Sequence, residues 1–264
     1  MGEGGAVFMN NSELKVSVLM CTNRLDDFFY QSMQSLIDQV FEGFEIILIL
    51  NGEALDSIEK LKEHYSKDPL IKIYTSTLYG LTHSLNIGLE HASGKYIARM
   101  DADDISDQYR LVTQYNFLES KPEISVCGSN HSLIDENGKS ISNVALPEND
   151  KKIKRALFFK NPICHPSVMY RRDLVVSVGG YSGGLYAEDY DLWTRLSLKK
   201  VKFHNIQKNL LGYRSISSGN ARGALIAYSS VSATQWKTFI LSRNPLWLLG
   251  SFISLMKGLL VSKK

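Results

Sequence analysis

Apolar runs alternate with amphipathic stretches over the first hundred residues of the chain. Four short runs are apolar at nearly every position, which is the pattern of strands buried on both faces of a parallel sheet. In the stretches between them, apolar residues recur every three or four positions, which predicts helices with one buried face. The predicted strands span residues 15–20, 45–50, 71–74 and 96–100, and the predicted helices span residues 28–40, 58–65 and 81–92.

This alternation of strand and helix predicts an α/β fold with a Rossmann-like, mostly parallel sheet flanked by helices. In such sheets, ligands bind beyond the carboxyl ends of the strands. The polar loops after the first and second strands and an acidic loop after the fourth all lie at that edge. A helix over 108–119, a strand over 124–127 and a helix over 189–198 extend one domain to about residue 214.

The C-terminal part of the chain has a different pattern. Residues 246–261 are apolar nearly all round, and 16 residues are fewer than the roughly 20 that span a bilayer. Basic residues flank them. A helix in the membrane interface with Trp247 at headgroup level fits this pattern, and so does a helix in the core or in an oligomer contact. We therefore expect a flexible tail over 1–14, a domain over 15–220, and a C-terminal helical segment over 221–264 that either associates with a membrane or packs on protein.

Composition narrows the function classes. The net charge of +3 is far from that of a typical nucleic-acid-binding protein, so no nucleic-acid partner is expected. The three cysteines are well separated and form no CxxC pair, which indicates reduced thiols and a cytoplasmic location. The start of the chain, at positions 1–14, has no signal-peptide pattern. P-loop, GxGxxG and GxSxG motifs are missing, which disfavours nucleotide hydrolases, dehydrogenases and serine hydrolases.

Three carboxylates follow the fourth predicted strand, on Asp101, Asp103 and Asp104. Like charges this close repel one another, and a cation among them removes the repulsion. Oxygen ligands suit hard cations such as Mg²⁺ or Mn²⁺, which also bind substrate phosphates. A solvated acidic turn, or a helix N-cap for which Asp104 is well suited, explains the same residues. Their position at the carboxyl end of a buried strand favours the metal site.

Further candidates lie in the second half of the chain. Glu188 and Asp189 open a predicted helix, where a carboxylate would serve as a general base or, more simply, as an N-cap and acidic first turn. His165 lies between two prolines, and both a ligand contact and a packed loop position fit it. Arg214 fits either a phosphate contact or a surface salt bridge.

Taken together and in this order, several motifs resemble family 2 glycosyltransferases of the GT-A fold. The resemblance covers residues 16–214. Within the family, the chain resembles above all the bacterial enzymes that build O-antigen, capsule or other surface polysaccharide. Two departures are the first loop, which lacks the usual proline and is a residue short, and Arg214-Ser215-Ile216, where the family has Arg-x-His. The matching motifs are LNIGL at 85–89, ASGKYIARMDADD at 92–104, HPSVM at 165–169, GGY at 179–181 and EDYDLW at 188–193.

The resemblance implies a role for each matching position. Asp189 would be the catalytic base, Asp103 would bind the metal, and Asp101 would face the ribose or sugar and also reach the metal. Asn51 stands where an aspartate usually reads the uracil edge, and an asparagine carbonyl can still accept from uracil N3–H. The implied nucleotide-sugar contacts are Thr22, Asn23, Arg24, Asn51, Asp101, Ala102, Asp103, His165, Glu188 and Arg214.

The implied function is an inverting, Mn²⁺- or Mg²⁺-dependent transfer of a hexose or N-acetylhexosamine, with galactose favoured, from a UDP-sugar. The acceptor would be a hydroxyl of a lipid-linked saccharide at the inner face of the cell membrane. The enzyme would act there as a monomer or an oligomer. One alternative is a sugar nucleotidyltransferase, which normally carries a Gly-rich basic loop after its first strand, whereas residues 21–27 contain no glycine. The other is a non-catalytic nucleotide-sugar or glycan-binding protein, against which the presence of both Asp103 and Asp189 argues.

Overall fold

The four apolar runs form neighbouring parallel strands of one sheet. The computed structural model describes residues 14–52, 57–65, 67–183, 186–215 and 221–261, so the tail expected over 1–14 lies almost wholly outside the described residues. In the strand order β3-β2-β1-β4, β2 and β3 are added on one side of β1, and β4 is added on its other side. The order of the strands thus changes direction between β1 and β4, and ligands bind at such a switch point in α/β sheets. These strands are β1 (Val16–Thr22), β2 (Phe44–Leu50), β3 (Ile71–Thr75) and β4 (Tyr96–Asp101).

Beyond β4 the sheet becomes mixed. The short strand β8 pairs antiparallel with both β4 and β6, and β9 then runs parallel to β6. The predicted strand at 124–127 is only the start of β6, because the polar residues that follow hide the rest of the strand from a hydrophobic pattern. The added strands are β5 (Ile105–Ser106), β6 (Ile124–Ile134), β7 (Ser140–Val144), β8 (Met169–Arg171) and β9 (Lys202–Arg214).

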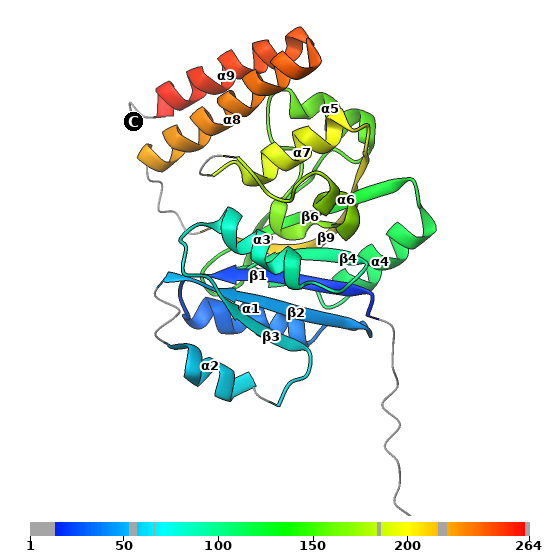
Figure 1. Ribbon diagram of the computed structural model, residues 1–264, viewed down its shortest axis with the longest axis vertical. Coiled ribbons are helices and arrows are strands. Elements are labelled where there is room, and N and C mark those ends of the chain that lie inside the picture. Colours follow the sequence, from blue (N-terminus) through cyan, green and yellow to red (C-terminus); the bar gives the residue numbers. More distant parts are fainter. Residues whose placement is uncertain (1–13, 53–56, 66, 184–185, 216–220, 262–264) are drawn as a thin grey trace, which may run out of the picture.

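Helices cover both faces of this sheet (Figure 1), which confirms the predicted α/β fold. Side chains of α1, α2 and α4 pack with one set of strand residues, and those of α3, α5, α6 and α7 pack with the other. The bounds are α1 (Asp27–Ile37), α2 (Ile58–Tyr65), α3 (Leu81–His91), α4 (Arg110–Ser120), α5 (Asp150–Leu157), α6 (Arg172–Ser177) and α7 (Glu188–Leu198).

Alternation along β1 divides the core between the two faces. Val18 and Met20 pack on the side of α1, and Leu19 between them packs on the side of α3. The helix α3 lies close to the sheet at Gly88, where a Cβ atom would lie only 1.9 Å from Leu19 Cδ1. A glycine at this position therefore sets how near α3 approaches the strands whose ends form the site.

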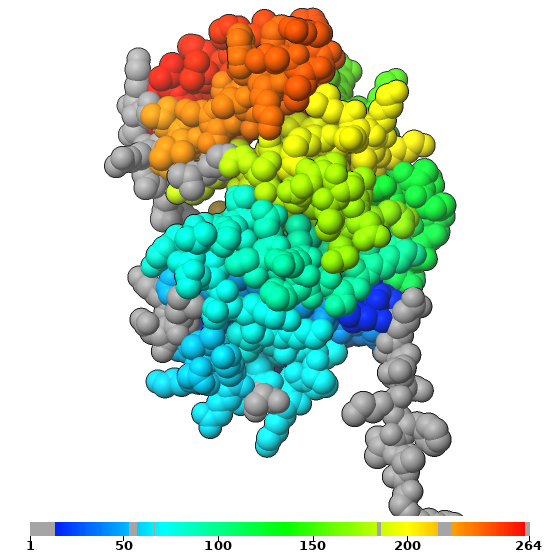
Figure 2. Space-filling view, viewed as in Figure 1, coloured from blue at the N-terminus to red at the C-terminus, as the bar shows by residue number. Residues whose placement is uncertain are grey.

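Two further helices, α8 (Ala221–Ser242) and α9 (Pro245–Val261), form a hairpin at one end of the molecule (Figure 1, Figure 2). Gln235 donates hydrogen bonds to Phe158 O and Tyr190 Oη, each at 2.9 Å. Trp247 packs on Phe158 with 4.6 Å between ring centroids and is 4% exposed. The expectation of Trp247 at headgroup level is therefore wrong, because this side of α9 is packed on protein.

Across the described ranges, no helix combines the length and the apolar character that crossing a bilayer requires. The helix α9 has 17 residues, which agrees with the sequence-based expectation that this segment is too short to span.

The packing of Trp247 predicts a large difference between two tryptophans of the hairpin. Trp247→Ala should lower the free energy of unfolding by about 3–5 kcal/mol, because it empties a buried site against Phe158. Trp236 is 47% exposed, so Trp236→Ala should change it by only about 0.5 kcal/mol. Urea unfolding monitored by far-UV circular dichroism measures both. Equal losses in the two variants would contradict the packing described here.

Candidate active site

The acidic cluster forms at the carboxyl end of β4. Asp101 is the last residue of the strand, and carboxylate oxygens of Asp101, Asp103 and Asp104 all lie within 4.8 Å of one another. Burial and the neighbouring Asp101 charge raise the pKa of Asp104 to about 8 and also raise the pKa of Asp103. Three carboxyl groups held this close retain protons more strongly than usual, and a bound cation would relieve the same crowding.

The helix α1 and the strand β9 hold the acidic loop in place. Ser32 Oγ of α1 donates to Asp101 O at 2.9 Å. Arg214 at the end of β9 donates from Nε to Asp103 O at 2.7 Å and from Nη1 to two further backbone carbonyls. Arg214 is 5% exposed, so a surface salt bridge is the wrong interpretation for it. Its guanidinium clamps the loop instead.

Asp104 is also tied to β9. Its Oδ1 accepts the backbone N–H of Arg214 at 2.8 Å, and its side chain is 1% exposed. The following helix begins only at Arg110, so the proposal that Asp104 caps a helix is wrong. Among the described residues, Asp104 Oδ2 is buried and has no hydrogen-bond partner. A buried carboxylate oxygen without a donor is one that a cation would satisfy.

A buried arginine that was not among the predicted site residues lies beside the acidic loop. Arg99 of β4 is 2% exposed and forms an ion pair with Asp101. Its Nε and Nη1 atoms are buried and have no partner in the described part of the chain. The sequence signal was a single arginine inside an otherwise apolar strand, which is a costly placement unless the charge is paired.

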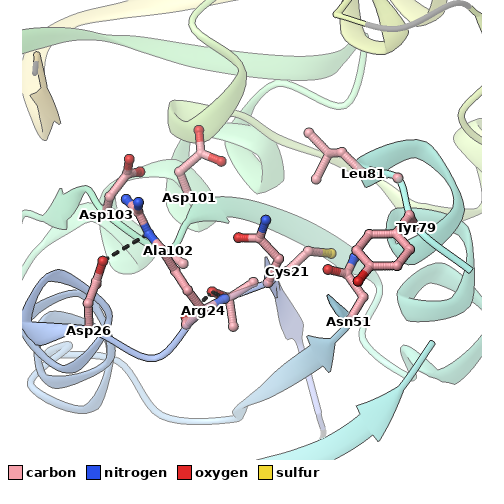
Figure 3. Close-up of a pocket in the computed structure, with 12 residues that line it drawn as sticks. Cys21, Arg24, Asp26, Asn51, Tyr79, Leu81, Asp101, Ala102 and Asp103 are labelled. Atoms are coloured by element: carbon pink, nitrogen blue, oxygen red, sulfur yellow. Dashed lines mark hydrogen bonds and ion pairs between the residues drawn. The ribbon is translucent and has the colours of Figure 1, made fainter. Parts of the chain in front are cut away.

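A cavity of about 300 Å³, which we call the β1–β4 cavity, opens at the change of direction between these two strands (Figure 3). The loop after β1, the residue after β2, the start of α3 and the acidic loop contribute its walls. Seven of the ten predicted nucleotide-sugar contacts lie among the described residues that line it. The lining residues are Cys21, Thr22, Asn23, Arg24, Asp26, Asn51, Tyr79, Gly80, Leu81, Asp101, Ala102 and Asp103.

The first loop and Asn51 have defined geometry. Thr22 Oγ1 donates to Arg24 O at 2.6 Å, and the Arg24 guanidinium pairs with Asp26 at 2.8 Å (Figure 3). Asn51 is 6% exposed and donates from Nδ2 to Ser84 Oγ at 2.7 Å. This bond uses one of the two N–H groups of the Asn51 amide, so the carbonyl and the second N–H are the groups that a ligand can use.

The cysteine in this cavity has an unreactive thiol. Burial raises the pKa of the Cys21 thiol to about 12, so the thiol stays protonated at neutral pH. A protonated thiol is a poor nucleophile and a poor metal ligand. Cys127 and Cys164 are also unpaired, in agreement with the expectation of reduced thiols.

Glu188 and Asp189 begin α7 and are not among the residues that line the β1–β4 cavity. Ala187 is the N-cap residue, so neither carboxylate has the N-cap position that the sequence allowed, and both lie in the acidic first turn of α7. Asp189 accepts from Asn161 Nδ2 at 2.5 Å and from the Tyr190 backbone N–H at 2.6 Å. Burial and the adjacent Glu188 charge nevertheless raise the pKa of Asp189 to about 6. A carboxyl that titrates near neutrality suits general acid–base chemistry.

His165 is packed next to this pair. Its Nε2 lies 3.0 Å from Tyr181 Oη, its Nδ1 lies 3.8 Å from Glu188 Oε1, and the residue is 8% exposed. Burial, with the Arg99 charge, lowers the pKa of His165 well below its usual value, so the ring is neutral. His165 therefore lies next to Glu188 and is not among the residues that line the β1–β4 cavity.

Comparison with known proteins places these features in a family. The model of the family "Glycosyl transferase family 2" matches residues 17–179. The chain belongs to glycosyl transferase family 2. It is 35% identical over 220 residues to the O-antigen biosynthesis glycosyltransferase WbnJ of Escherichia coli, covering 82% of this chain and 86% of that protein. It is 35% identical over 168 residues to the amylovoran biosynthesis glycosyltransferase AmsE of Erwinia amylovora, covering 63% and 62%.

Solved structures share the fold of this family 2 glycosyltransferase. The mannosyltransferase PcManGT from Pyrobaculum calidifontis, in complex with GDP-Man and Mn²⁺, has a TM-score of 0.65 at 14% identity, with 95% of this chain and 74% of that chain covered. Residues 1–349 of Staphylococcus aureus TarS, in complex with UDP-GlcNAc, have a TM-score of 0.68 at 16% identity, with 94% and 70% covered. These likenesses confirm the expected GT-A-like fold.

The environment of Asp189 predicts an unusual titration. Its carboxyl should titrate near pH 6, and Asn161→Ala should raise that midpoint by roughly one pH unit, because the lost hydrogen bond stabilises the ionised form. Carboxyl ¹³C NMR of labelled protein measures both values. Asn137→Ala, in an exposed turn, is the matched control and should leave the midpoint unchanged. A midpoint near 3.8, the ordinary value of aspartate, would contradict the described environment.

Proposed function

We propose that this glycosyltransferase moves a sugar from a UDP-sugar to a hydroxyl of a lipid-linked saccharide, with inversion at the anomeric carbon, during bacterial surface-polysaccharide synthesis. The observation that carries the proposal is a site in two parts. One part is a cavity walled by the acidic loop, and the other is a carboxylate of raised pKa at the start of α7. The names of the relatives from Escherichia coli and Erwinia amylovora support the polysaccharide assignment.

The donor would bind in the β1–β4 cavity with its base at Asn51. Ser84 holds the amide nitrogen of Asn51, and the Asn51 carbonyl would accept from a base that carries a ring N–H. Uracil N3 and guanine N1 carry that hydrogen, whereas cytosine N3 and adenine N1 do not. Thr22, Asn23 and Arg24 lie beside it and would contact the nucleoside. A TarS structure that contains UDP-GlcNAc supports a uridine donor.

The acidic loop has the donor chemistry of a hard-cation site. Asp101 and Asp103 would hold Mn²⁺ or Mg²⁺, and the unpartnered buried Oδ2 of Asp104 fits the same ion. When bound, such an ion neutralises charge on the leaving diphosphate. Arg99 fixes the Asp101 carboxylate from the protein side through their ion pair. A neighbour structure that contains Mn²⁺ supports this assignment.

Asp189 would be the general base. Its carboxylate, oriented by Asn161, would take the proton of the acceptor hydroxyl as the hydroxyl oxygen attacks the anomeric carbon. A single displacement of this kind inverts the configuration and releases UDP. The donor sugar is proposed to be galactose or another hexose or N-acetylhexosamine.

Replacement of the proposed base tests this function. Asp189→Asn should lower the transfer rate by about 10²–10⁴-fold while UDP binding with Mn²⁺ stays unchanged. In the unmodified protein, transfer should fall as the pH drops below about 6, because Asp189 becomes protonated there. UDP release is measured with a panel of UDP-sugars, with and without lipid-linked glycans from bacterial membranes, and chelation of divalent metal should abolish it.

The matched control is Asp173→Asn, whose side chain is 98% exposed on α6 and which should keep full activity. Undiminished transfer by Asp189→Asn would exclude Asp189 as the base. UDP binding without release under any condition would favour the non-catalytic alternative, and formation of UDP-sugar from sugar phosphate and UTP would favour the nucleotidyltransferase.

The outer side of the C-terminal hairpin supports a membrane location. Residues 192–264 contain twelve Lys and Arg and no Asp or Glu, so every acidic residue of the chain precedes them. The α9 side chains turned away from Trp247 form an exposed apolar surface, which we call the α9 face. An apolar helix surface in a basic segment suits an anionic bilayer. The α9 face consists of Leu246, Leu249, Phe252, Leu255, Met256, Leu259 and Leu260. We propose that it lies on the inner face of the cell membrane.

Vesicle binding tests the α9 face in the full chain. The triple variant Leu249→Gln, Phe252→Gln, Met256→Gln should weaken co-sedimentation with phosphatidylglycerol-containing vesicles by about tenfold or more. The reason is that three apolar side chains that would enter the bilayer are replaced by polar ones. Binding to pure phosphatidylcholine vesicles should be weaker in every variant. Val176→Gln, at a 49% exposed position on α6, is the control and should bind normally. Unchanged sedimentation of the triple variant, with a change from dimer to monomer, would support the oligomer contact instead.

A further inference from the structure

Both oxygens of the Asp189 carboxylate are held by the protein, and the two donors come from different segments. The backbone N–H of Tyr190, the next residue of α7, donates to Oδ1 at 2.6 Å. Asn161, which follows α5, donates from Nδ2 to Oδ2 at 2.5 Å. The direction of this carboxylate therefore depends on how residues 158–161 and the first turn of α7 lie relative to each other.

A buried glutamine of the C-terminal hairpin joins these two segments. Gln235 of α8 is 0% exposed, and its Nε2 donates to Phe158 O and to Tyr190 Oη, each at 2.9 Å. The Tyr190 hydroxyl in turn donates to Leu157 O at the end of α5. One side-chain amide thus fastens both of the segments that hold the Asp189 carboxylate.

The space around the Gln235 amide is closely fitted. The helix α9 passes over the same bonds at Gly250, where a Cβ atom would lie 1.9 Å from Phe158 O and 3.0 Å from Gln235 Nε2. Among the described residues, Gln235 Oε1 is buried and has no hydrogen-bond partner. An unpaired buried amide oxygen lowers stability, and an apolar side chain of similar size would not. The glutamine is therefore explained by the groups that its nitrogen holds.

We propose that Gln235 is a positioning residue of the transfer reaction, which orients Asp189 through Tyr190 and through the segment after α5. The inference rests on the proposed function, in which Asp189 is the general base. It makes α8 a part of the active site, although the match to the family model ends at residue 179. The hairpin that carries the α9 face then also sets the direction from which the base meets the acceptor hydroxyl.

Gln235→Met in the full chain tests this role, because methionine has a similar length and lacks the amide. The kcat of transfer should fall about tenfold or more, since small misplacements of a catalytic group are costly, while KM for the UDP-sugar stays unchanged. The titration midpoint of Asp189, followed by carboxyl ¹³C NMR, should rise from about 6 by roughly half a pH unit, because hydrogen bonds to the ionised form weaken. The neighbouring groups Glu188, Arg99 and Tyr181, which interact electrostatically with this carboxyl, are not altered.

Tyr190→Phe is a second variant, and it decides the question on its own if Gln235→Met does not fold. It keeps the buried ring and removes the hydroxyl that Gln235 contacts, so kcat and the midpoint should change in the same directions. The double variant should lose far less activity than the product of the two single losses, because both substitutions break one shared bond.

Ser232→Ala is the matched control. Ser232 is also buried in α8, and its hydroxyl bonds to Ser251 of α9, so the substitution removes hydrogen bonds within the hairpin. It should keep both kcat and the Asp189 midpoint. An unchanged kcat or midpoint in Gln235→Met, or an equal loss in Ser232→Ala, would overturn the proposal. Failure of the proposed function is a different result, in which Asp189→Asn retains transfer.

Discussion

Repulsion among three carboxylates is the constraint around which the site is built. Asp101, Asp103 and Asp104 hold their oxygens within 4.8 Å of one another, an arrangement that would spread apart if the loop were free. The protein opposes this in three ways. Arg99 pairs with Asp101 from inside the sheet, Arg214 clamps the loop backbone from β9, and α1 donates a further hydrogen bond.

The same constraint explains why the two halves of the chain depend on each other. The acidic loop ends the fourth parallel strand, but Arg214, which holds it, comes from the last strand of the sheet. The carboxylates of α7 come from the second half as well, and Asn161 orients Asp189 from another segment. The antiparallel strand β8 joins these parts to β4. Burial and, to a lesser extent, the Asp101 charge raise the pKa of Glu188, so the acidic loop and the start of α7 lie within electrostatic range of each other.

The C-terminal hairpin has two faces of different character. Gln235 and Trp247 fasten it to the protein near α7, while the α9 face remains exposed and apolar within a segment that has no acidic residue. Apart from Trp247, the packed side of α9 carries small residues, which let the helix lie close to its neighbours. Most of the large apolar side chains of residues 246–261 lie on the exposed side, which is why the hydrophobicity of the segment did not indicate the side that packs on protein.

The strands and the acidic loop in the first half of the protein were predictable from the sequence. Buried parallel strands are apolar on both faces, so 15–20, 45–50, 71–74 and 96–100 were readable, and the cluster at Asp101–Asp104 followed from its position after a strand. Seven residues that the family resemblance implied as donor contacts line the β1–β4 cavity, at the edge where loops after parallel strands meet.

The contacts of the polar residues in the second half depend on which distant groups the fold brings next to them. The pattern of β6 hid most of its length, and Arg214 lies buried as a clamp where the sequence allowed a phosphate contact or a surface salt bridge. Arg99, Ser84 and Asn161 gained their importance from partners 2 to 33 positions away or on other elements. Hydrophobic periodicity reports which face of an element is buried, but it carries no information about which distant group a polar side chain meets, and those meetings set the charge and shape of this site.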